Sequence, residues 1–303
     1  MSVVLGDNRY GKIEVHVVRV SRRGETHDLL DWTVSVQLSG DFADTHLTGN
    51  NALVIPTDTQ KNTVYALSKR LGATEPEAFA LALGRHFLDG FSHVTAAHIR
   101  IVHHCWKRLG SAESPHPHAF ARDASFEREV LLHLKRGRSG LLANLVSGIS
   151  ELTLLKSTAS EFVGYLRDQF TTLKEAHDRI MATQVSARWR RPEQRPDELE
   201  GIDWGASHAR VSGALMLAFA DHHSLSLQQT LHLMAKRALE ADDGLCAIKL
   251  SLPNRHHLLV DLSPFGLTNE NEVFHAVDAG PFGLIEAVFA RDGATVPPAW
   301  TDW

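Results

Sequence analysis

Two side chains that could act together on a ligand, Asn254 and His256, stand two positions apart in a strand-like segment. Side chains two apart on a strand leave the same face, so both can converge on one ligand. His257, the next residue, would face away. The spacing therefore predicts an amide and an imidazole aimed at the same ligand.

Lys12 and the Thr57-Asp58 step each have two interpretations. Lys12, at the mouth of a strand, is either a solvated terminal lysine or a base whose pKa desolvation would lower. Thr57-Asp58 precedes a helical segment, where it would serve as an N-cap. The same helix start also offers backbone N–H donors to an anionic ligand. The residues alone leave these alternatives open.

Residues Gly6 to Lys12 read Gly-x-x-x-x-Gly-Lys, which matches most of a phosphate-binding loop. The context does not fit, because Ile13 follows where Ser or Thr is needed and no strand precedes the motif. The residues after it alternate as a strand and do not begin the helix that would hold phosphate. Nucleoside-triphosphate binding is therefore not predicted.

The many histidines do not form a metal-binding pattern. The adjacent pairs His103-His104 and His222-His223 would each point to opposite faces of a strand. His116 and His118 would share a face, but no third ligand lies near them in the sequence, and such a site needs three or four. No metal site is predicted.

Composition favours a small-molecule substrate. The chain has 303 residues, a length suited to about two compact domains, and a formal net charge of −5. The charges are spread along the chain and form no acidic or basic tail. No nucleic-acid or membrane partner is indicated.

Three features lead us to expect a cytoplasmic protein. Cys105 and Cys246 lack the paired spacing of a disulfide framework or metal site, which fits a reducing compartment. No secretory signal opens the sequence, and no apolar run approaches the ~20 residues that span a bilayer. Thr301-Asp302-Trp303 at the end differs from the Ser-Lys-Leu peroxisomal address.

Hydrophobic periodicity predicts the elements that would position these residues. Segments 11–20 and 29–39 alternate as an antiparallel strand pair with Gly24 in the turn. A helix is predicted over 75–90, with a Thr74/Glu77 capping box at its start. Its apolar stripe consists of Phe79, Leu83, Phe87 and Phe91.

The second half repeats the order of the first: two strands, helices, two strands. Arg190 to Glu200 reads as a loop, and 206–242 is rich in helix, with a stripe at Leu227, Leu231, Met234 and Ala238. The remaining predicted strands are 93–106, 118–135, 142–156, 179–191, 247–262 and 283–291. Helices would cover one face of each antiparallel four-stranded sheet, so we expect assembly to cover the other.

Four segments together resemble the urate oxidase family, the cofactor-free uricases. They are Ile55–Thr63, Ser160–Leu173, His177–Ile180 and Leu252–His257. The match runs from Tyr10 to Ile285, nearly the whole chain, in the family's order and spacing.

The resemblance implies an α+β fold of two tandem tunnelling-fold modules, residues 1–138 and 139–303. Each module would be an antiparallel four-stranded sheet with helices on one face. Four chains would stack their sheets into a barrel, and each active site would be shared between two chains. The homotetramer and the shared sites follow from the family.

The implied reaction converts urate, dioxygen and water into 5-hydroxyisourate and hydrogen peroxide without flavin, haem or metal. Lys12, Thr57 and His256 would form a proton relay, and Asn254 and Thr57 would hold dioxygen and water. The implied substrate-binding residues are Thr57, Asp58, Phe162, Arg179, Leu227, Gln228 and Asn254.

The urate-binding positions also have plain structural interpretations. Phe162 would ordinarily be a core residue, although the family stacks an aromatic ring under the substrate there. Arg179 could be a surface residue at a strand start, although the family uses its planar guanidinium on the pyrimidine edge of urate. Gln228 lies in a first helical turn, and its amide offers both donor and acceptor to the other purine edge.

The sequence departs from the family pattern beside the site. His177 stands where relatives often have Trp, and Arg255 and His257 flank His256 where many have a neutral residue and an aromatic. Two alternatives to urate oxidation remain. One is a pteridine or GTP-cyclising enzyme of the same fold, which would use a glutamate anchor and often zinc. The other is a purine-binding module without turnover.

Overall fold

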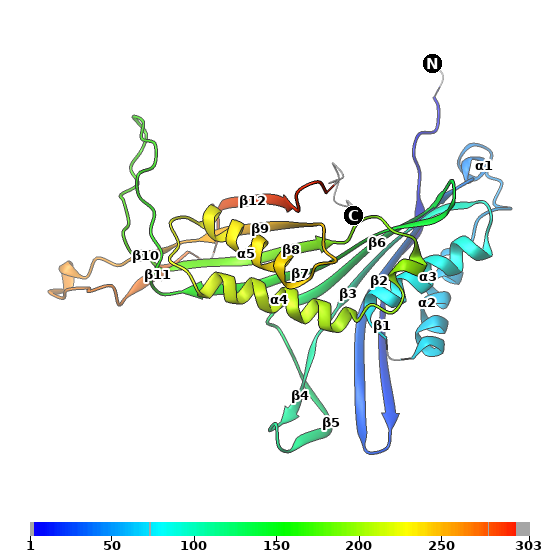
Figure 1. Ribbon diagram of the computed structural model, residues 1–303, viewed down its shortest axis with the longest axis horizontal. Coiled ribbons are helices and arrows are strands. Elements are labelled where there is room, and N and C mark those ends of the chain that lie inside the picture. Colours follow the sequence, from blue (N-terminus) through cyan, green and yellow to red (C-terminus); the bar gives the residue numbers. More distant parts are fainter. Residues whose placement is uncertain (1–2, 73, 278, 295–303) are drawn as a thin grey trace. The chain divides into compact units, whose positions relative to one another are not determined.

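The computed structural model describes residues 3–72, 74–277 and 279–294 (Figure 1). Residues 301–303, which the sequence predicts not to form a peroxisomal address, lie outside these ranges. The described residues form two compact units. Unit 1 comprises those of Met1–Gly148 and Trp189–Ala206, and unit 2 those of Ile149–Arg188 and Ser207–Ala294. The predicted module boundary at 138/139 stays a prediction. No described helix is long and apolar enough to cross a membrane.

Unit 1 contains an antiparallel sheet in the order β1-β2-β3-β6, followed by the start of β7. Its strands are β1 (Tyr10–Arg23), β2 (Thr26–Gly40), β3 (Val94–His103) and β6 (Glu127–Gly137). Its helices are α1 (Ala43–Leu47), α2 (Thr57–Leu71) and α3 (Pro76–Gly90). A separate hairpin joins β4 (Trp106–Gly110) to β5 (Pro115–Arg122).

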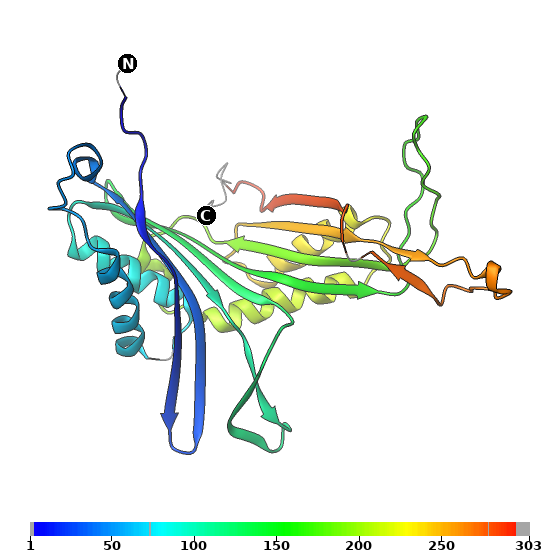
Figure 2. The ribbon, with the colours of Figure 1, turned by 180° about the vertical axis from the view of Figure 1, so that it is seen from behind.

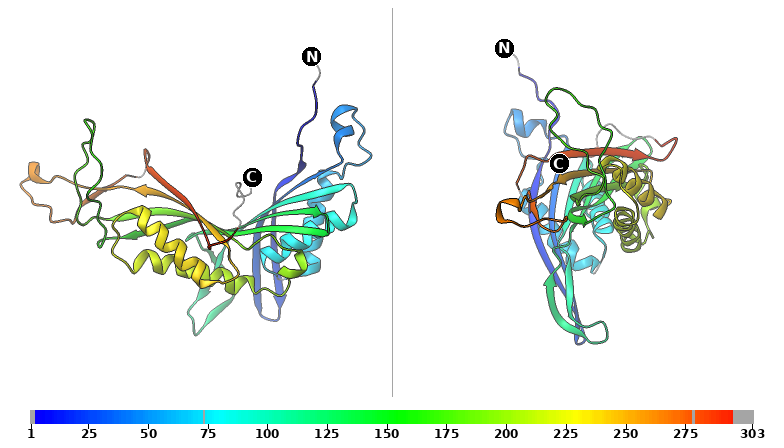
Figure 3. Two further views of the ribbon diagram at one scale, coloured as in Figure 1. Left: turned by 45° about the horizontal axis from the view of Figure 1, so that its top comes forward. Right: turned by 90° about the vertical axis from the view of Figure 1, so that its left-hand side faces the viewer.

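Unit 2 contains the strand order β7-β8-β9-β12, with residues of β7 and β8 belonging to both units. The strands are β7 (Gly140–Lys156), β8 (Met181–Arg190), β9 (Ala247–Arg255) and β12 (Gly283–Ala290). Helices α4 (Trp204–Ala220) and α5 (Leu227–Ala241) lie along one face of these strands (Figure 3). The other face of the strands is seen in Figure 2. The short pieces of unit 2 are η2 (Ser263–Phe265), β10 (His257–Leu259) and β11 (Phe274–Ala276), whereas η1 (Pro196–Leu199) belongs to unit 1.

Most predicted elements are present, but three of the predicted strands are interrupted. The segment predicted as 93–106 ends at His103, and the one predicted as 118–135 is divided between β5 and β6. Between them Asp123 accepts hydrogen bonds from the backbone and hydroxyl of Ser125, which makes a turn. The segment predicted as 247–262 breaks at His256, between β9 and β10.

The two predicted apolar stripes are largely confirmed as core. Phe79, Leu83 and Phe87 on α3 are fully buried, while Phe91 is only partly buried beside them. The stripe on α5, from Leu227 to Ala238, is buried throughout. Burial of such side chains contributes about 1.5 to 3 kcal/mol each, and it holds the helices against their sheets.

The predicted capping box at the start of α3 is wrong. Glu75 is the N-cap residue, no side chain caps the helix, and Pro76 occupies its first turn. The Glu77 carboxylate is fully buried and lies 2.6 Å from Arg128 Nη2. Its other oxygen accepts a hydrogen bond of 2.7 Å from Ser147. Burial raises the pKa of the Glu77 carboxyl, and Arg128 opposes that change.

The sheet face of unit 1 opposite its apolar core carries polar side chains. On β2, Trp32 and Val34 point into the core and Thr33 points away, as period-two alternation requires. The imidazoles of His98 on β3 and His133 on β6 stack with centroids 4.4 Å apart. Burial, with His133 nearby, lowers the pKa of His98 to about 4.

We expect Glu77→Gln to lower the free energy of unfolding by roughly 3 kcal/mol, because it removes one charge of a buried pair and leaves Arg128 under-compensated. Urea denaturation monitored by circular dichroism measures the change. Glu200→Gln is the matched control, since Glu200 pairs with Arg85 at the surface and should contribute at most about 1 kcal/mol. Equal effects of the two substitutions would contradict the structural role of Glu77.

We expect His98→Gln to make the melting temperature fall less steeply as the pH is lowered. Unfolded His98 binds a proton below about pH 6.5, but folded His98 does so only near pH 4, so protonation favours unfolding between these values. Stability from this residue is therefore present above about pH 6.5 and lost as the pH falls. Melting temperatures at several pH values test this against His118→Gln, an exposed control on β5. Parallel profiles for parent and His98→Gln would refute it.

Candidate active site

A cavity of about 270 Å³ in unit 2 collects six of the residues singled out in the sequence. They come from the loop before β8, the start of α5 and the end of β9. They are Phe162, Arg179, Leu227, Gln228, Asn254 and His256. The other three, Lys12, Thr57 and Asp58, lie in unit 1.

Backbone hydrogen bonds fix the loop that carries Phe162 and Arg179. Phe162 and Ala176 exchange two bonds, with N···O distances of 2.7 and 3.1 Å. The N–H of Arg179 donates to the carbonyl of Ser160 over 2.8 Å. Ser224, just before α5, receives a 2.8 Å bond from the N–H of Glu161. The loop is therefore tied both to itself and to the helix start that borders the cavity.

The Arg179 guanidinium is half-buried beside an aromatic ring. Its Cζ lies 5.6 Å from the centroid of the Phe162 ring. Burial lowers the pKa of Arg179, although the group stays charged at neutral pH. Among the described residues, its buried Nε has no hydrogen-bond partner. A desolvated cation with an unmet donor favours an anionic ligand with acceptors in one plane.

The start of α5 supplies further donors. The Ser226 hydroxyl caps the helix by accepting from the N–H of Gln229 over 3.1 Å. The Gln229 side chain is also engaged, because its oxygen accepts from the N–H of Leu225. Gln228 is exposed, and among the described residues its amide has no partner. The first-turn N–H groups of Leu227 and Gln228 remain available to a ligand.

Asn254 and His256 reach the same cavity although the strand breaks between them. Asn254 is opposite Gly283 in the β9–β12 pairing, so no side chain at that position competes for the space. The His256 carbonyl accepts a 2.9 Å bond from the N–H of Val277. That bond fixes the backbone at the break, and both side chains line the cavity.

In unit 1, one hydrogen bond ties together the two segments that carry Lys12 and Thr57. The Tyr10 hydroxyl accepts from the N–H of Ile55 over 2.8 Å, which ties the start of β1 to the segment before α2. Lys12 is half-buried and directly precedes a β-bulge, where Glu14 has φ of 58°. Tyr10 gave no signal in the sequence beyond an aromatic at a strand start.

The interpretation of Thr57 as an N-cap is wrong, because Pro56 is the cap and Thr57 is the exposed first helical residue. Asp58 accepts hydrogen bonds from Lys61 and Asn62. The bond from Lys61 lowers the pKa of the Asp58 carboxyl most, and the charge of Lys12 adds to this. Lys12 is therefore close enough to act electrostatically on the helix start.

The cavity also includes residues that sequence reasoning missed. Lys174 and Leu173 come from a polar loop with no periodicity, and Ile285 lies on β12, opposite Leu252. His257 also lines the cavity, although it was expected to face away. The strand break at His256 removes the regular alternation on which that expectation rested.

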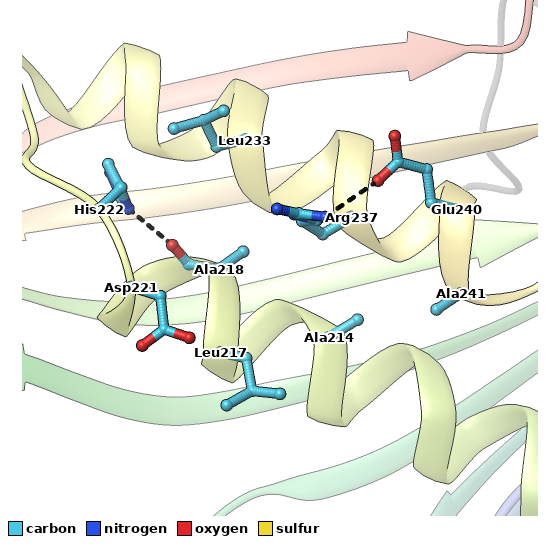
Figure 4. A pocket seen from close by; sticks show the side chains of 9 residues that line it. All are labelled: Ala214, Leu217, Ala218, Asp221, His222, Leu233, Arg237, Glu240 and Ala241. Atoms are coloured by element: carbon cyan, nitrogen blue, oxygen red, sulfur yellow. Dashed lines mark hydrogen bonds and ion pairs between the residues drawn. The ribbon is translucent and has the colours of Figure 1, made fainter.

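A larger cavity of about 420 Å³ lies between α4 and α5 and contains none of the predicted residues (Figure 4). Its Arg237 pairs with Glu240 at 3.6 Å, and one ring nitrogen of His222 bonds the Ala218 carbonyl. It therefore offers no isolated cation comparable to Arg179. Among the described residues, one group has the proximity needed for a metal, His16, Asp31 and His104 in unit 1.

Known proteins resemble this chain over nearly its whole length. The family model described as "Uricase" matches residues 8–133 and 145–286. The uricase of Arthrobacter globiformis is 47% identical over 301 residues, covering 99% of this chain and 94% of that protein. That of Aspergillus flavus is 36% identical over 296 residues, covering 93% and 95%. The crystal structure of the A. globiformis uricase superimposes with a TM-score of 0.90 at 46% identity, covering all of both chains. Matches of this extent establish that the chain belongs to the uricase family.

Proposed function

We propose that this chain oxidises urate with dioxygen and water to 5-hydroxyisourate and hydrogen peroxide. The observation that carries the proposal is the half-buried guanidinium of Arg179, which lies beside the Phe162 ring in a cavity that also contains Gln228. Urate is a flat anion with hydrogen-bonding groups on its edges, and these groups meet that description. Membership of the uricase family supports the same substrate.

In this proposal the substrate lies flat against Phe162. Arg179 binds the pyrimidine edge through two parallel hydrogen bonds, one of which gives its buried Nε an acceptor. Gln228 and the backbone N–H of Leu227 bind the remaining edge. Thr57 and Asp58 bind the five-membered ring at the start of α2, where backbone N–H groups favour negative charge.

The oxidation uses the electron-rich urate dianion itself as the reductant. Two electrons pass from urate to dioxygen, which becomes hydrogen peroxide, and one water supplies the new hydroxyl. Asn254 and Thr57 hold dioxygen and water, and Lys12, Thr57 and His256 relay the protons. The chain's contribution is orientation, deprotonation and exclusion of bulk water, so the reaction needs no flavin, haem or metal.

We further propose two tandem tunnelling-fold modules and a homotetramer whose sites are shared between chains. Positive φ at a glutamate recurs in the first strand of each four-strand set, at Glu14 in β1 and Glu151 in β7, which supports duplication. Leu166 and Phe170 are 95% and 79% exposed, and a partner chain would cover them. The free cysteines Cys105 and Cys246 support the proposed cytoplasmic location.

A pteridine or GTP-cyclising enzyme and a binding module without turnover make different predictions. The first would anchor its heterocycle with a glutamate, where this cavity has Gln228. The second needs no proton relay. Loss of the urate absorption band with equimolar peroxide release, in protein free of flavin and metal, tests the proposal. Urate that is bound but not consumed would overturn it.

Arg179→Ala should weaken urate binding by roughly 2 to 5 kcal/mol, because it removes one partner of a desolvated charge-assisted pair. Anaerobic titration measures binding without turnover. Arg167→Ala is the matched control, since Arg167 lies in the same loop but is exposed and does not line the cavity. Unchanged affinity in Arg179→Ala would remove this residue from the site.

Lys12→Met should retain the fold and slow the chemical step by ~10²- to 10⁴-fold, the usual effect of losing a placed acid–base group. Single-turnover decay of bound urate isolates that step. Lys69→Met, at an exposed position on α2, controls for loss of a surface charge. A rate within about twofold of the parent would exclude Lys12 from the relay.

Thr57→Ala and Arg179→Ala should complement each other if sites are shared between chains. Each homogeneous variant should be strongly impaired, whereas co-refolding should create interfaces that pair an intact Thr57 with an intact Arg179. Urate turnover of the mixture is compared with each variant refolded alone, after sizing confirms mixed tetramers. No recovery in verified mixed tetramers would mean that each site is built within one chain.

A further inference from the structure

Three segments of unit 1 bring together two imidazoles and a carboxylate outside the urate site. His16 lies on β1, Asp31 on β2, and His104 directly follows β3. His16 Nε2 is 2.6 Å from Asp31 Oδ1, and one ligand atom from each of the three residues lies within 4.8 Å of the others. The N–H of His104 donates to the Asp31 carbonyl over 2.9 Å, so the backbone fixes this arrangement.

We propose that His16, Asp31 and His104 bind a divalent transition-metal ion, with zinc as the best match. Two imidazole nitrogens and one carboxylate oxygen form a ligand set that zinc accepts with water in its fourth position. Zinc bonds of about 2.0 to 2.2 Å place tetrahedral donors roughly 3.3 Å apart. His16 Nε2 and Asp31 Oδ1, now 2.6 Å apart, must therefore separate to admit the ion. The His16 side chain is 60% exposed, so it has room to make that adjustment.

Neighbouring side chains already orient two of the ligands. Trp106 Nε1–H donates to Asp31 Oδ2 over 2.9 Å, leaving the other carboxylate oxygen toward His16. His104 contacts Thr33 through Nε2 and Glu127 through Nδ1, at 2.8 and 3.0 Å. His104 would give one nitrogen to the metal and keep the other contact as its orienting bond. Outer partners of this kind commonly support metal ligands.

The Asp31 carboxyl accepts hydrogen bonds at both oxygens, from His16 and from Trp106. Burial alone would raise its pKa, but hydrogen bonds from His16 and Trp106, with the charges of nearby histidines, lower it overall. The buried Asp31 carboxylate therefore offers an oxygen donor beside the His16 imidazole.

Arg122 supplies the positive charge of the cluster in this structure. Its Nη2 lies 2.7 Å from His104 Nδ1 and 3.0 Å from Glu127, and its Nη1 is 3.8 Å from Asp31. The side chain is 38% exposed, so it can turn to solvent. Zinc would take over its electrostatic role and would link β1, β2 and the end of β3 through one ion.

The test uses the chelator-stripped, full-length chain titrated with zinc chloride by isothermal calorimetry, with cobalt(II) absorption as a report on geometry. We expect one tight site per chain and a higher melting temperature with zinc. His16→Asn should weaken this site by more than ~100-fold, beyond the 10- to 100-fold typical of losing an outer partner. His118→Asn, an exposed histidine beside His116, is the control and should leave the site intact.

Two variants probe the surroundings. Trp106→Phe should weaken zinc binding by roughly 10- to 100-fold through loss of the bond that orients Asp31. Arg122→Gln should strengthen it, because the competing cation is removed. Absence of a tight site in the parent, or His16→Asn with the parent's affinity, would overturn the proposal. Weaker binding in Arg122→Gln would overturn the inference that zinc replaces its charge.

Discussion

The desolvation of one guanidinium is the constraint on which the candidate site depends. Arg179 is half-buried, its pKa is lowered by burial, and its Nε lacks a partner among the described residues. A charge left in that state destabilises the free protein. It persists because the Arg179 backbone is bonded to Ser160, and the same loop is bonded to Ser224 at the start of α5. A bound anion would compensate the buried charge of Arg179. The free energy that folding uses to bury this charge therefore contributes to selectivity for an anionic ligand.

Unit 1 places its polar groups by a different means. Lys12 and Thr57 belong to elements joined by the Tyr10 hydroxyl, which exchanges hydrogen bonds with the backbone of Ile55. Burial raises the pKa of Tyr10, and the contact with Ile55 opposes that change. A neutral phenol therefore holds a helix start beside a strand start without adding a charge that would compete with Lys12.

Local periodicity was enough to predict β1, β2, α3 and α5, because each buries one regular stripe. It was not enough where a residue's partner is distant in the sequence. Glu77 has the spacing of a capping box, yet Arg128 and Ser147 claim its carboxylate. The break at His256 was missed for the same reason, since the bond that fixes it comes from Val277, 21 positions later and directly after β11.

The residues of the candidate site were likewise only partly predictable from the sequence. Family resemblance pointed to six residues that line one cavity, but neither periodicity nor spacing alone could have assembled them. Lys174 and Ile285 border the same cavity and carried no signal. The proximity of His16, Asp31 and His104 carried no signal in the sequence, because strand pairing collects these side chains from three distant segments.

The buried carboxylate of Glu77 also constrains the order in which the chain can fold as it leaves the ribosome. Its hydroxyl partner, Ser147, is made 70 residues after it, and Arg128 is made 51 residues after it. Until Arg128 has emerged, α3 cannot close over the sheet without enclosing an uncompensated charge, and until Ser147 has emerged the second carboxylate oxygen lacks its hydrogen bond. A nascent chain that ends near residue 138 would still lack Ser147. Completion of the first core during synthesis therefore waits for the opening strand of the second half.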